Sequence, residues 1–388
     1  MTISRSSIVQ AFEQRFGGSP DVVVRAPGRV NIIGEHTDYN HGFVLPMAIE
    51  RETVIAARRR EDRALHARAE NLDRETVVDL DRRVRSAEEP WVDYIVGVAE
   101  ELAKEGLPLT GADLVVEGDV PIGCGLSSSA ALEMAALCMF EHFGGFTMEG
   151  PAAARLGQRV ENLFLGLSTG IMDQFISRCG KAGHGLFLDC RNFEYELVPI
   201  AFPDAVFVIA NTACPRGLTS SKYNERVAEC GEAVRALQQG ANPNGTHLRD
   251  YTVDELDACA GLMGDVAYRR ARHVITEDDR TLAARDAMRA GDMARLGELM
   301  TASDISLRDD YEVTNAELNA MTEIARGLPG CFGARMTGAG FGGCTINLVA
   351  ADAAEAFAAS LLAQYKTATG RDGEVILSKP VDGAGVLV

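Results

Sequence analysis

Residues 25–50, RAPGRVNIIGEHTDYNHGFVLPMAIE, decide the fold and give the first indication of function. Val22–Val24 predicts a short strand, Pro27-Gly28 interrupts it, and the apolar residues of 30–33 predict a buried strand that ends at Gly34. The next five residues, EHTDY at 35–39, carry two carboxyl groups, an imidazole and two hydroxyl groups. Strand ends commonly present binding groups. This turn therefore favours a ligand covered with hydroxyl groups, and a solvated polar turn is the alternative.

A second segment, VPIGCGLSSSAALE at 120–133, places a glycine-rich turn and three serines directly before an Ala/Leu/Met-rich helical pattern. Gly123 and Gly125 allow the backbone to approach a ligand closely, and the serine hydroxyls are hydrogen-bond donors. The N-terminus of the following helix attracts anions. The segment therefore indicates a phosphate site, with an ordinary N-capped helix as the alternative. No lysine follows the second glycine, so this is not a Walker A loop.

A third segment, TGAGFGGC at 337–344, has four glycines in six positions before the apolar run at 345–349. Such a loop permits close approach of the backbone to a ligand or to another loop. Taken alone it indicates only a turn before a strand. Its value comes from its combination with the other two segments.

Together the three segments resemble the galactokinases, a family of the GHMP superfamily of small-molecule kinases. GRVNIIGEHTDYN is similar to the signature that separates the sugar kinases from mevalonate and homoserine kinases, and GCGLSSSA and TGAGFGGC resemble the second and third superfamily motifs. The resemblance covers essentially the whole chain. It implies transfer of the ATP γ-phosphoryl group to the anomeric hydroxyl of galactose, the entry step of galactose catabolism by the Leloir pathway. The chain departs from the family at Cys124 and Asp304, neither of which we expect to be catalytic.

The resemblance also implies an α+β, two-domain GHMP-kinase-like fold with the active site in the interdomain cleft. We expect the boundary near residue 200, with an N-terminal domain at 1–200 and a C-terminal domain at 201–388. The residue patterns predict strands at 22–33, 113–118, 185–190, 205–211, 344–350 and 374–378, and helices at 93–105, 129–143, 151–165, 223–239, 266–274, 315–326 and 351–366.

Candidate catalytic residues follow from what phosphoryl transfer requires, which is positioning, charge stabilisation and a carboxylate near the attacking hydroxyl. Asp173 corresponds to the catalytic aspartate of the family, and Arg29 corresponds to the arginine that pairs with it. A helix-capping aspartate and a structural salt bridge are the alternatives. Mg²⁺ binds oxygen ligands and keeps several waters, so one hydroxyl and one carboxylate suffice beside ATP. By similarity Ser129 and Glu161 supply them, and an ordinary solvated helix carboxylate is the alternative for Glu161.

The resemblance assigns two further groups of contacts. The sugar contacts are Glu35, His36, Thr37, Asp38, Gly170, Asp173 and Tyr223. The nucleotide contacts are Gly123, Cys124, Gly125, Leu126, Ser127, Ser128 and Ser129. A kinase for a related sugar, such as N-acetylgalactosamine, and a non-catalytic sensor of galactose and ATP are the alternative functions. The complete serine-rich loop and the presence of Asp173 favour an enzyme.

The composition indicates a soluble intracellular enzyme. The 388 residues, 46% of them hydrophobic, suffice for two domain cores. The 38 basic and 56 acidic residues give a net charge of −18, which argues against nucleic-acid or anionic-membrane binding. Nine cysteines without CxxC pairs indicate a reduced compartment, and neither a signal peptide nor an apolar stretch of about 18 residues is present. We therefore expect a cytoplasmic enzyme that binds galactose, ATP and Mg²⁺, with no obligate protein partner evident.

Overall fold

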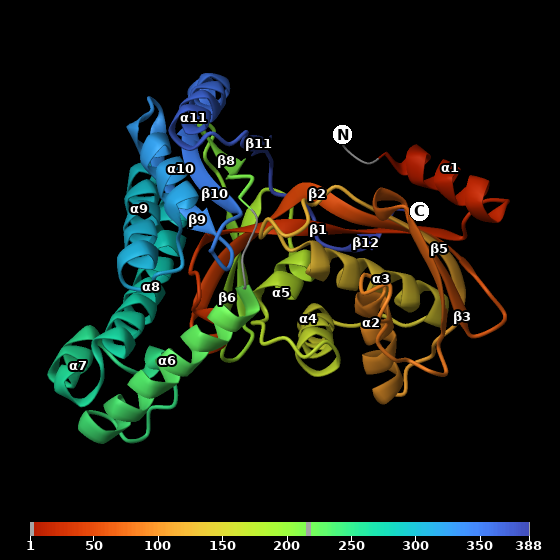
Figure 1. Cartoon of the computed structure of the whole chain (residues 1–388), viewed down its shortest axis with the longest axis horizontal. Coiled ribbons are helices and arrows are strands. Elements are labelled where there is room, and N and C mark those ends of the chain that lie inside the picture. Colours follow the sequence, from red (N-terminus) through yellow and green to blue (C-terminus); the bar gives the residue numbers. More distant parts are fainter. Residues whose placement is uncertain (1–3, 215–218, 388) are drawn as a thin grey trace.

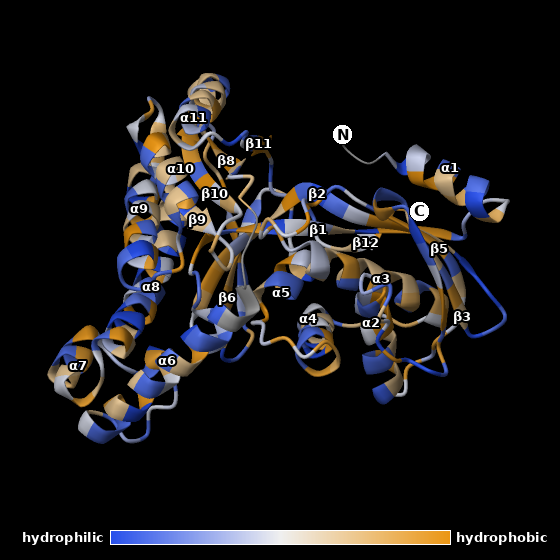
Figure 2. Ribbon diagram, viewed as in Figure 1, coloured by the Kyte–Doolittle hydropathy of each residue, from blue (hydrophilic) through white to orange (hydrophobic). Residues whose placement is uncertain are grey.

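The computed structural model describes residues 4–214 and 219–387. Two β-sheets form its framework, and the long strands β1 (Val22–Ile33) and β2 (Phe43–Arg59) cross the middle of the molecule (Figure 1). Hydrophobic residues gather in the strands of both sheets, whereas the outer helices carry more hydrophilic residues (Figure 2). This arrangement of mixed helices and sheets agrees with the predicted α+β class. No helix within the described residues is both long and apolar enough to cross a membrane.

The larger sheet has the strand order β12-β1-β2-β5-β3-β4, and β6 and β7 continue from β2. All of its strand pairs are antiparallel except β3 with β5. β1 is one strand with a shift in register between Pro27 and Arg29, so the predicted break at Pro27-Gly28 is a local irregularity instead. A Cβ at Gly28 would lie 2.6 Å from the carbonyl oxygen of Leu126, which explains the glycine. The other strands are β3 (Ala64–Ala69), β4 (Arg74–Asp79), β5 (Ala112–Gly118), β6 (His184–Asp189), β7 (Tyr195–Pro199) and β12 (Gly385–Val386).

Helices cover both faces of the larger sheet. Because side chains alternate along a strand, Val22 and Val24 of β1 pack into a core with α2, α3 and α4, whereas Val23 packs with Phe12 of α1 on the opposite face. The helices are α1 (Arg5–Phe16), α2 (Asp93–Lys104), α3 (Ser128–Gly144), α4 (Gly150–Arg159) and α5 (Met172–Cys179). Ser127, directly before α3, bonds to Asp173 at the start of α5, so the starts of these two helices lie together and can build one site.

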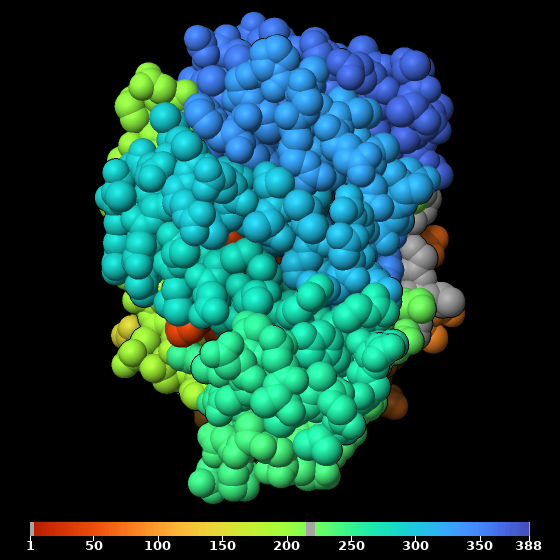
Figure 3. Space-filling view, turned by 90° about the vertical axis from the view of Figure 1, so that its left-hand side faces the viewer, coloured from red at the N-terminus to blue at the C-terminus, as the bar shows by residue number. Residues whose placement is uncertain are grey.

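The smaller sheet has the antiparallel order β11-β8-β10-β9. One face packs against α10 and α11, and the other face packs in a core that also contains Ile32 of β1 and Met288 of α8. The elements are β8 (Ala205–Asn211), β9 (Cys331–Thr337), β10 (Cys344–Ala350), β11 (Glu374–Leu377), α6 (Thr219–Gly240), α7 (Val253–Ala258), α8 (Asp265–Ala290), α9 (Met293–Asp309), α10 (Ala316–Gly327) and α11 (Ala354–Thr369). Residues of the C-terminal half, drawn from green to blue, form most of the face seen in Figure 3, where the N-terminal half shows only as smaller red, orange and yellow-green areas.

The change from the larger to the smaller sheet falls between β7, which ends at Pro199, and β8, which begins at Ala205. We therefore keep residue 200 as the proposed boundary between the N-terminal unit, 1–200, and the C-terminal unit, 201–388. The two units are joined across this boundary. The C-terminal strand β12 returns to pair with β1, and the core around Ile32 contains residues of both sheets.

The predicted elements have counterparts in the structure, but some have other bounds, and several observed elements were not predicted. The helix predicted at 266–274 extends to Ala290, and the helix predicted at 151–165 ends at Arg159, followed by a π-helical turn at Val160–Phe164. The sequence patterns did not predict β2, β3, β4, β7, β9, β12, α5, α7 or α9. The short 3₁₀ segments are Asp38–Asn40, Glu70–Leu72, Leu248–Asp250, Ala260–Leu262 and Ala351–Ala353.

Candidate active site

A cleft of about 700 Å³ lies where three parts of the chain meet. They are the sugar turn (residues 35–39), the phosphate loop (residues 123–129) and the start of α5. Most of the predicted site residues line this cleft. They are Arg29, Glu35, His36, Asp38, Gly123, Gly125, Ser127, Ser128, Ser129, Glu161, Gly170, Asp173 and Tyr223.

Asp173 and Arg29 form a two-point ion pair in the cleft. Arg29 Nε donates to Asp173 Oδ1 and Arg29 Nη2 donates to Asp173 Oδ2, each at 2.8 Å. Ser127 Oγ donates a further hydrogen bond to Asp173 Oδ2. The Asp173 side chain is 31% exposed, whereas that of Arg29 is 5% exposed. The buried guanidinium therefore fixes the orientation of a carboxylate that remains open to a ligand.

The phosphate loop has a backbone shape that its glycines permit. Gly123, Gly125 and Ser127 have φ angles of 74°, 79° and 63°, in the left-handed region that glycine adopts without steric cost. The 17-residue helix α3 then begins at Ser128, so its N-terminal amides and its positive dipole end lie beside the cleft. A Gly-rich turn that leads into a helix N-terminus has the geometry of an anion site.

Ser129 and Glu161 meet across the cleft. Ser129 Oγ donates to Glu161 Oε1 at 3.0 Å. Glu161 is only 5% exposed, so the alternative of an ordinary solvated carboxylate is wrong. It belongs to the π-helical turn that follows α4. Burial raises the pKa of Glu161, and the charge of Asp173 raises it further. A bound cation would relieve this unfavourable clustering of acidic groups, so the pair fits a divalent metal ion.

Glu133 and Gln174 are part of the same cluster, and the sequence analysis missed them. Gln174 Nε2 donates to Glu133 Oε2 at 3.0 Å, which joins α3 to the residue next to Asp173. Glu133 is fully buried, and burial together with Glu161 raises its pKa well above the ordinary value. The signal that could have found Glu133 is its position one helical turn after Ser129, because residues at i and i+4 share a helix face.

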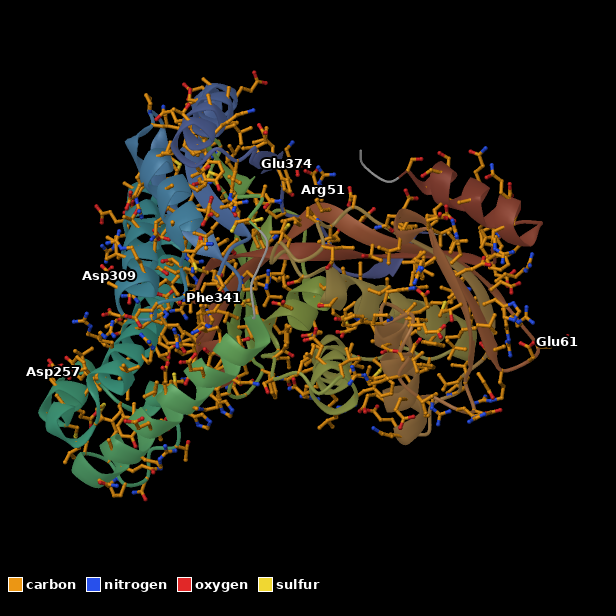
Figure 4. All side chains as sticks on the ribbon, in the orientation of Figure 1. Arg51, Glu61, Asp257, Asp309, Phe341 and Glu374 are labelled. Atoms are coloured by element: carbon orange, nitrogen blue, oxygen red, sulfur yellow. The ribbon has the colours of Figure 1, made fainter. Side chains whose placement is uncertain are left out.

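The sugar turn is held by the glycine-rich third segment. The backbone N–H of Gly338 donates to Glu35 Oε1 at 2.6 Å, and Arg335 Nη1 lies 3.4 Å from the same oxygen. Phe341, in the same loop, is labelled near the junction of the two units in Figure 4. The third segment therefore contacts another loop, which is one of the two roles that its glycines permit.

Helix α8 holds the chain before and after the sugar turn through three side chains. His273 Nε2 lies 3.1 Å from the carbonyl oxygen of Glu35, and Glu277 Oε1 accepts from the N–H of Gly34 at 3.0 Å. Asp278 Oδ1 accepts from the N–H of Phe43 at 2.8 Å. Burial alone would raise the pKa of Glu277, but Arg280, followed by His273 and Arg335, lowers it to about 2. Glu277 is therefore an anion that anchors the start of the turn.

Asp38 and Gly170 are in close contact. A Cβ at position 170 would overlap the Asp38 carboxylate, so only glycine fits there without a shift. Burial, followed by the charge of Asp173, raises the pKa of Asp38 to about 7. The ring of Tyr223, in α6, lies edge to face with the ring of Tyr39 in the sugar turn, with centroids 4.7 Å apart. These contacts bring together, at one end of the cleft, the turn that follows β1, the segment that precedes α5, and helix α6.

Three predicted contacts do not line the cleft. Thr37 is buried, and its hydroxyl lies 2.9 Å from the carbonyl oxygen of Gly34 and 2.6 Å from that of Phe43, so it stabilises the turn. Leu126 is buried in the core shared by the two sheets. The Cys124 sulfur accepts from the side-chain amide of Asn211 at 3.3 Å. Their side chains support the site, and the ligand contacts predicted for these three residues stay predictions.

Comparison with known proteins agrees with this geometry. The galactokinase galactose-binding signature matches residues 10–59, the GHMP kinases N terminal domain matches 93–181, and the GHMP kinases C terminal matches 284–367. A galactokinase of Chloroflexus aurantiacus is 45% identical over 98% of this chain and 97% of its own length. One from Roseiflexus sp. is 44% identical over 97% of this chain and 95% of its own length. This chain belongs to the galactokinase family.

Solved structures share the fold of this chain. The crystal structure of Lactococcus lactis galactokinase complexed with galactose is 38% identical, with a TM-score of 0.94 and coverage of 98% of both chains. A mevalonate kinase of Methanococcus jannaschii, at 18% identity, shares the fold with a TM-score of 0.66 over 94% of this chain and 99% of its own. As a member of the galactokinase family, the chain is a kinase that uses ATP and a small-molecule substrate.

Proposed function

We propose that this chain transfers the γ-phosphoryl group of ATP to the anomeric hydroxyl of galactose, giving galactose 1-phosphate and ADP. One observation carries the proposal. A sugar turn that matches the galactokinase signature opens into the same cleft as the Asp173–Arg29 pair and the phosphate loop. The sugar complex of the Lactococcus lactis relative supports galactose as the substrate. The reaction would feed galactose into the Leloir pathway.

The roles of the reacting groups follow from the geometry. Asp173 is open to the cleft and fixed by Arg29, so it would accept or orient the proton of the attacking hydroxyl. Arg29 would also stabilise the charge that develops during transfer. The phosphate loop would hold the phosphates of ATP through backbone and serine hydroxyl donors. The chain thus supplies positioning and charge stabilisation, which are the main requirements of phosphoryl transfer.

We assign Ser129 and Glu161 as the residues that would hold Mg²⁺ beside ATP. Their contact, and the burial that makes an uncompensated Glu161 charge unfavourable, support this assignment. When bound, the ion supplies charge neutralisation at the phosphates. Because Ser129 belongs to the phosphate loop, the pair would hold the ion beside that loop.

The sugar contacts that we propose are Glu35, His36, Asp38, Gly170, Asp173 and Tyr223. All line the same cleft. Buried donors and acceptors that the wrong sugar leaves unpaired discriminate strongly between substrates. We further propose a cytoplasmic location, which the scattered cysteines and the acidic charge support.

A coupled assay of ADP release tests the function. The sugars are galactose, talose, glucose, 2-deoxygalactose and N-acetylgalactosamine, with mevalonate as the control acceptor. We expect the highest kcat/KM with galactose and no release with mevalonate. A higher kcat/KM with N-acetylgalactosamine would identify a kinase for that sugar. Galactose binding by calorimetry without ADP release from any acceptor would identify a sensor.

A further inference from the structure

A line of hydrogen-bonding side chains runs from the cleft into the C-terminal unit. His36 Nδ1 lies 2.9 Å from the hydroxyl oxygen of Tyr39, which lies 2.6 Å from the hydroxyl oxygen of Tyr311. The Tyr311 oxygen lies 3.3 Å from the sulfur of Cys230. His36, Tyr311 and Cys230 are buried, and Tyr39 is half-buried. Each group can donate only one proton along this line. The hydrogen bonds therefore all point toward His36 or all point toward Cys230.

The other ring nitrogen of His36 faces the cleft side of the ring. Among the described residues Nε2 has no well-aligned hydrogen-bond partner, although the backbone of Ala339 raises the pKa of the ring; His36 is only 5% exposed and lines the cleft. A buried polar atom without a partner costs free energy, which a ligand oxygen or hydroxyl would recover. Whether Nε2 offers a proton or a lone pair to the sugar is decided by which nitrogen carries the proton.

The two ends of the line favour one direction. An imidazole nitrogen is a strong acceptor and a phenol is a better donor than a neutral imidazole N–H, so Tyr39 donates to His36 Nδ1. At the other end sulfur is a weak acceptor, so Cys230 donates to Tyr311 in preference to accepting from it. Both preferences are met when every proton points toward His36. In the opposite direction, the last hydroxyl would donate to sulfur.

We propose that the Tyr39–Tyr311–Cys230 line fixes His36 as the tautomer protonated at Nε2, so that His36 donates a hydrogen bond to an oxygen of the sugar. Tyr39 and Tyr311 are then positioning residues that act through His36. The inference rests on the proposed function for the identity of the ligand, but the tautomer is a property of the protein alone.

The surroundings keep the ring neutral, as the tautomer requires. Burial lowers the pKa of His36, and the charges of His273, Arg226 and Arg335 contribute, which gives a value of about 3. At neutral pH the ring therefore carries a single N–H. The ring also lies against Tyr311, with centroids 4.8 Å apart, which limits its rotation.

The decisive experiment is ¹H–¹⁵N correlation spectroscopy of the sugar-free full chain labelled with ¹⁵N-histidine. The spectrum of His36→Gln identifies the His36 signals among those of the seven histidines. We expect a protonated Nε2 and an unprotonated Nδ1 at pH 7. A protonated Nδ1 would overturn the proposal. Because no sugar is present, this result is independent of whether the chain phosphorylates galactose.

Kinetics of Tyr39→Phe test the positioning role. The variant keeps the ring but removes the donor to Nδ1, so we expect the galactose KM to rise about three- to tenfold, the range for loss of one hydrogen bond. The ATP KM should stay unchanged. Tyr268→Phe is the matched control, because among the described residues the Tyr268 hydroxyl bonds only to exposed Asp257, which lies at the outer edge in Figure 4. An unchanged galactose KM in Tyr39→Phe, with the Nε2 proton retained, would contradict the role of Tyr39.

If the wild-type chain releases no ADP with galactose, the proposed function fails while the tautomer measurement stands. If the wild type is active and the tautomer is reversed, only the inference about His36 fails. The two outcomes are therefore distinguishable.

Discussion

The sugar turn and the phosphate loop face the same cleft but are held in different ways. The turn is bound at Gly34, Glu35 and Phe43 by residues beyond position 270 in the C-terminal unit. The phosphate loop is bound mainly by residues of the N-terminal unit, such as Arg29, whose backbone N–H donates to the Leu126 carbonyl at 3.0 Å. Selection of the sugar therefore depends on the packing of both units, whereas binding of the phosphates depends mostly on one.

The largest expected effect is at Asp173, where the two regions meet. Asp173→Asn is nearly isosteric, but the amide cannot accept the proton of the sugar hydroxyl as a carboxylate does. We expect kcat to fall by about 10² to 10⁴, with ATP binding and the fold preserved. Single-turnover phosphorylation with calorimetry of each ligand measures this. Asp286→Asn, at an exposed ion pair on α8, is the control. A folded Asp173→Asn variant with near wild-type turnover would remove Asp173 from the mechanism.

Gly170→Ala tests the sugar side alone. The added Cβ would overlap the Asp38 carboxylate and displace it from the cleft wall. We expect kcat/KM for galactose to fall about 10- to 100-fold, because a displaced binding group leaves buried polar atoms unpaired. The ATP Kd should be unchanged. Gly327→Ala is a matched control, because open space surrounds position 327. Equal losses in sugar and nucleotide binding would show that the two sides of the cleft are coupled. This result would contradict the view that the sugar turn and the phosphate loop are held by different parts of the molecule.

Glu277→Gln tests the support that α8 gives to the sugar turn. The amide keeps an acceptor for the Gly34 N–H but removes the charge that pairs with Arg280. We expect the galactose KM to rise about three- to tenfold and the free energy of unfolding to fall by about 1–3 kcal/mol. Enzyme kinetics and urea unfolding measure the two effects. Glu298→Gln, at an exposed pair on α9, should change neither. An ATP KM that rises as much as the galactose KM would contradict a role confined to the sugar turn.

The stability effect of Glu277→Gln should depend on pH. The folded pKa of Glu277 is about 2, below its ordinary value of 4.5, so its contribution is fully present above about pH 4.5 and is lost as the pH falls toward 2. The difference in unfolding free energy between wild type and variant should therefore shrink below pH 4.5. A difference that stays constant down to pH 2 would show that the carboxylate charge is not its source.

Ser129→Ala tests the phosphate side and has the smallest expected effect. It removes one hydroxyl from the Ser129–Glu161 pair, so we expect about a threefold higher Mg²⁺ requirement or a similar fall in kcat, with galactose binding nearly intact. Titration of Mg²⁺ at saturating galactose measures this. Ser19→Ala, at an exposed contact with Glu13, is the control. Loss of galactose binding with ordinary Mg²⁺ dependence would move Ser129 to the sugar side.

Local chemistry made several features predictable from the sequence. Gly123 and Gly125 adopt left-handed conformations that glycine permits, and α3 begins at Ser128, as the turn and helix patterns predicted. The polar residues after Ile33 face a cleft because a strand end places them there. The resemblance then supplied Asp173 and Arg29, whose pairing no local pattern reveals because 144 residues separate them.

Other features were decided only by the tertiary structure. A regular helix through 151–165 leaves Glu161 beside its apolar face, but the π-helical turn changes the helical phase and buries this carboxylate against Ser129. Thr37 faces its own turn although the motif predicts a sugar contact. The sequence by itself determined which polar groups are available and which turns they occupy, because these depend on neighbouring residues. The tertiary structure decided which groups meet, because side-chain direction and distant partners depend on how the two sheets pack.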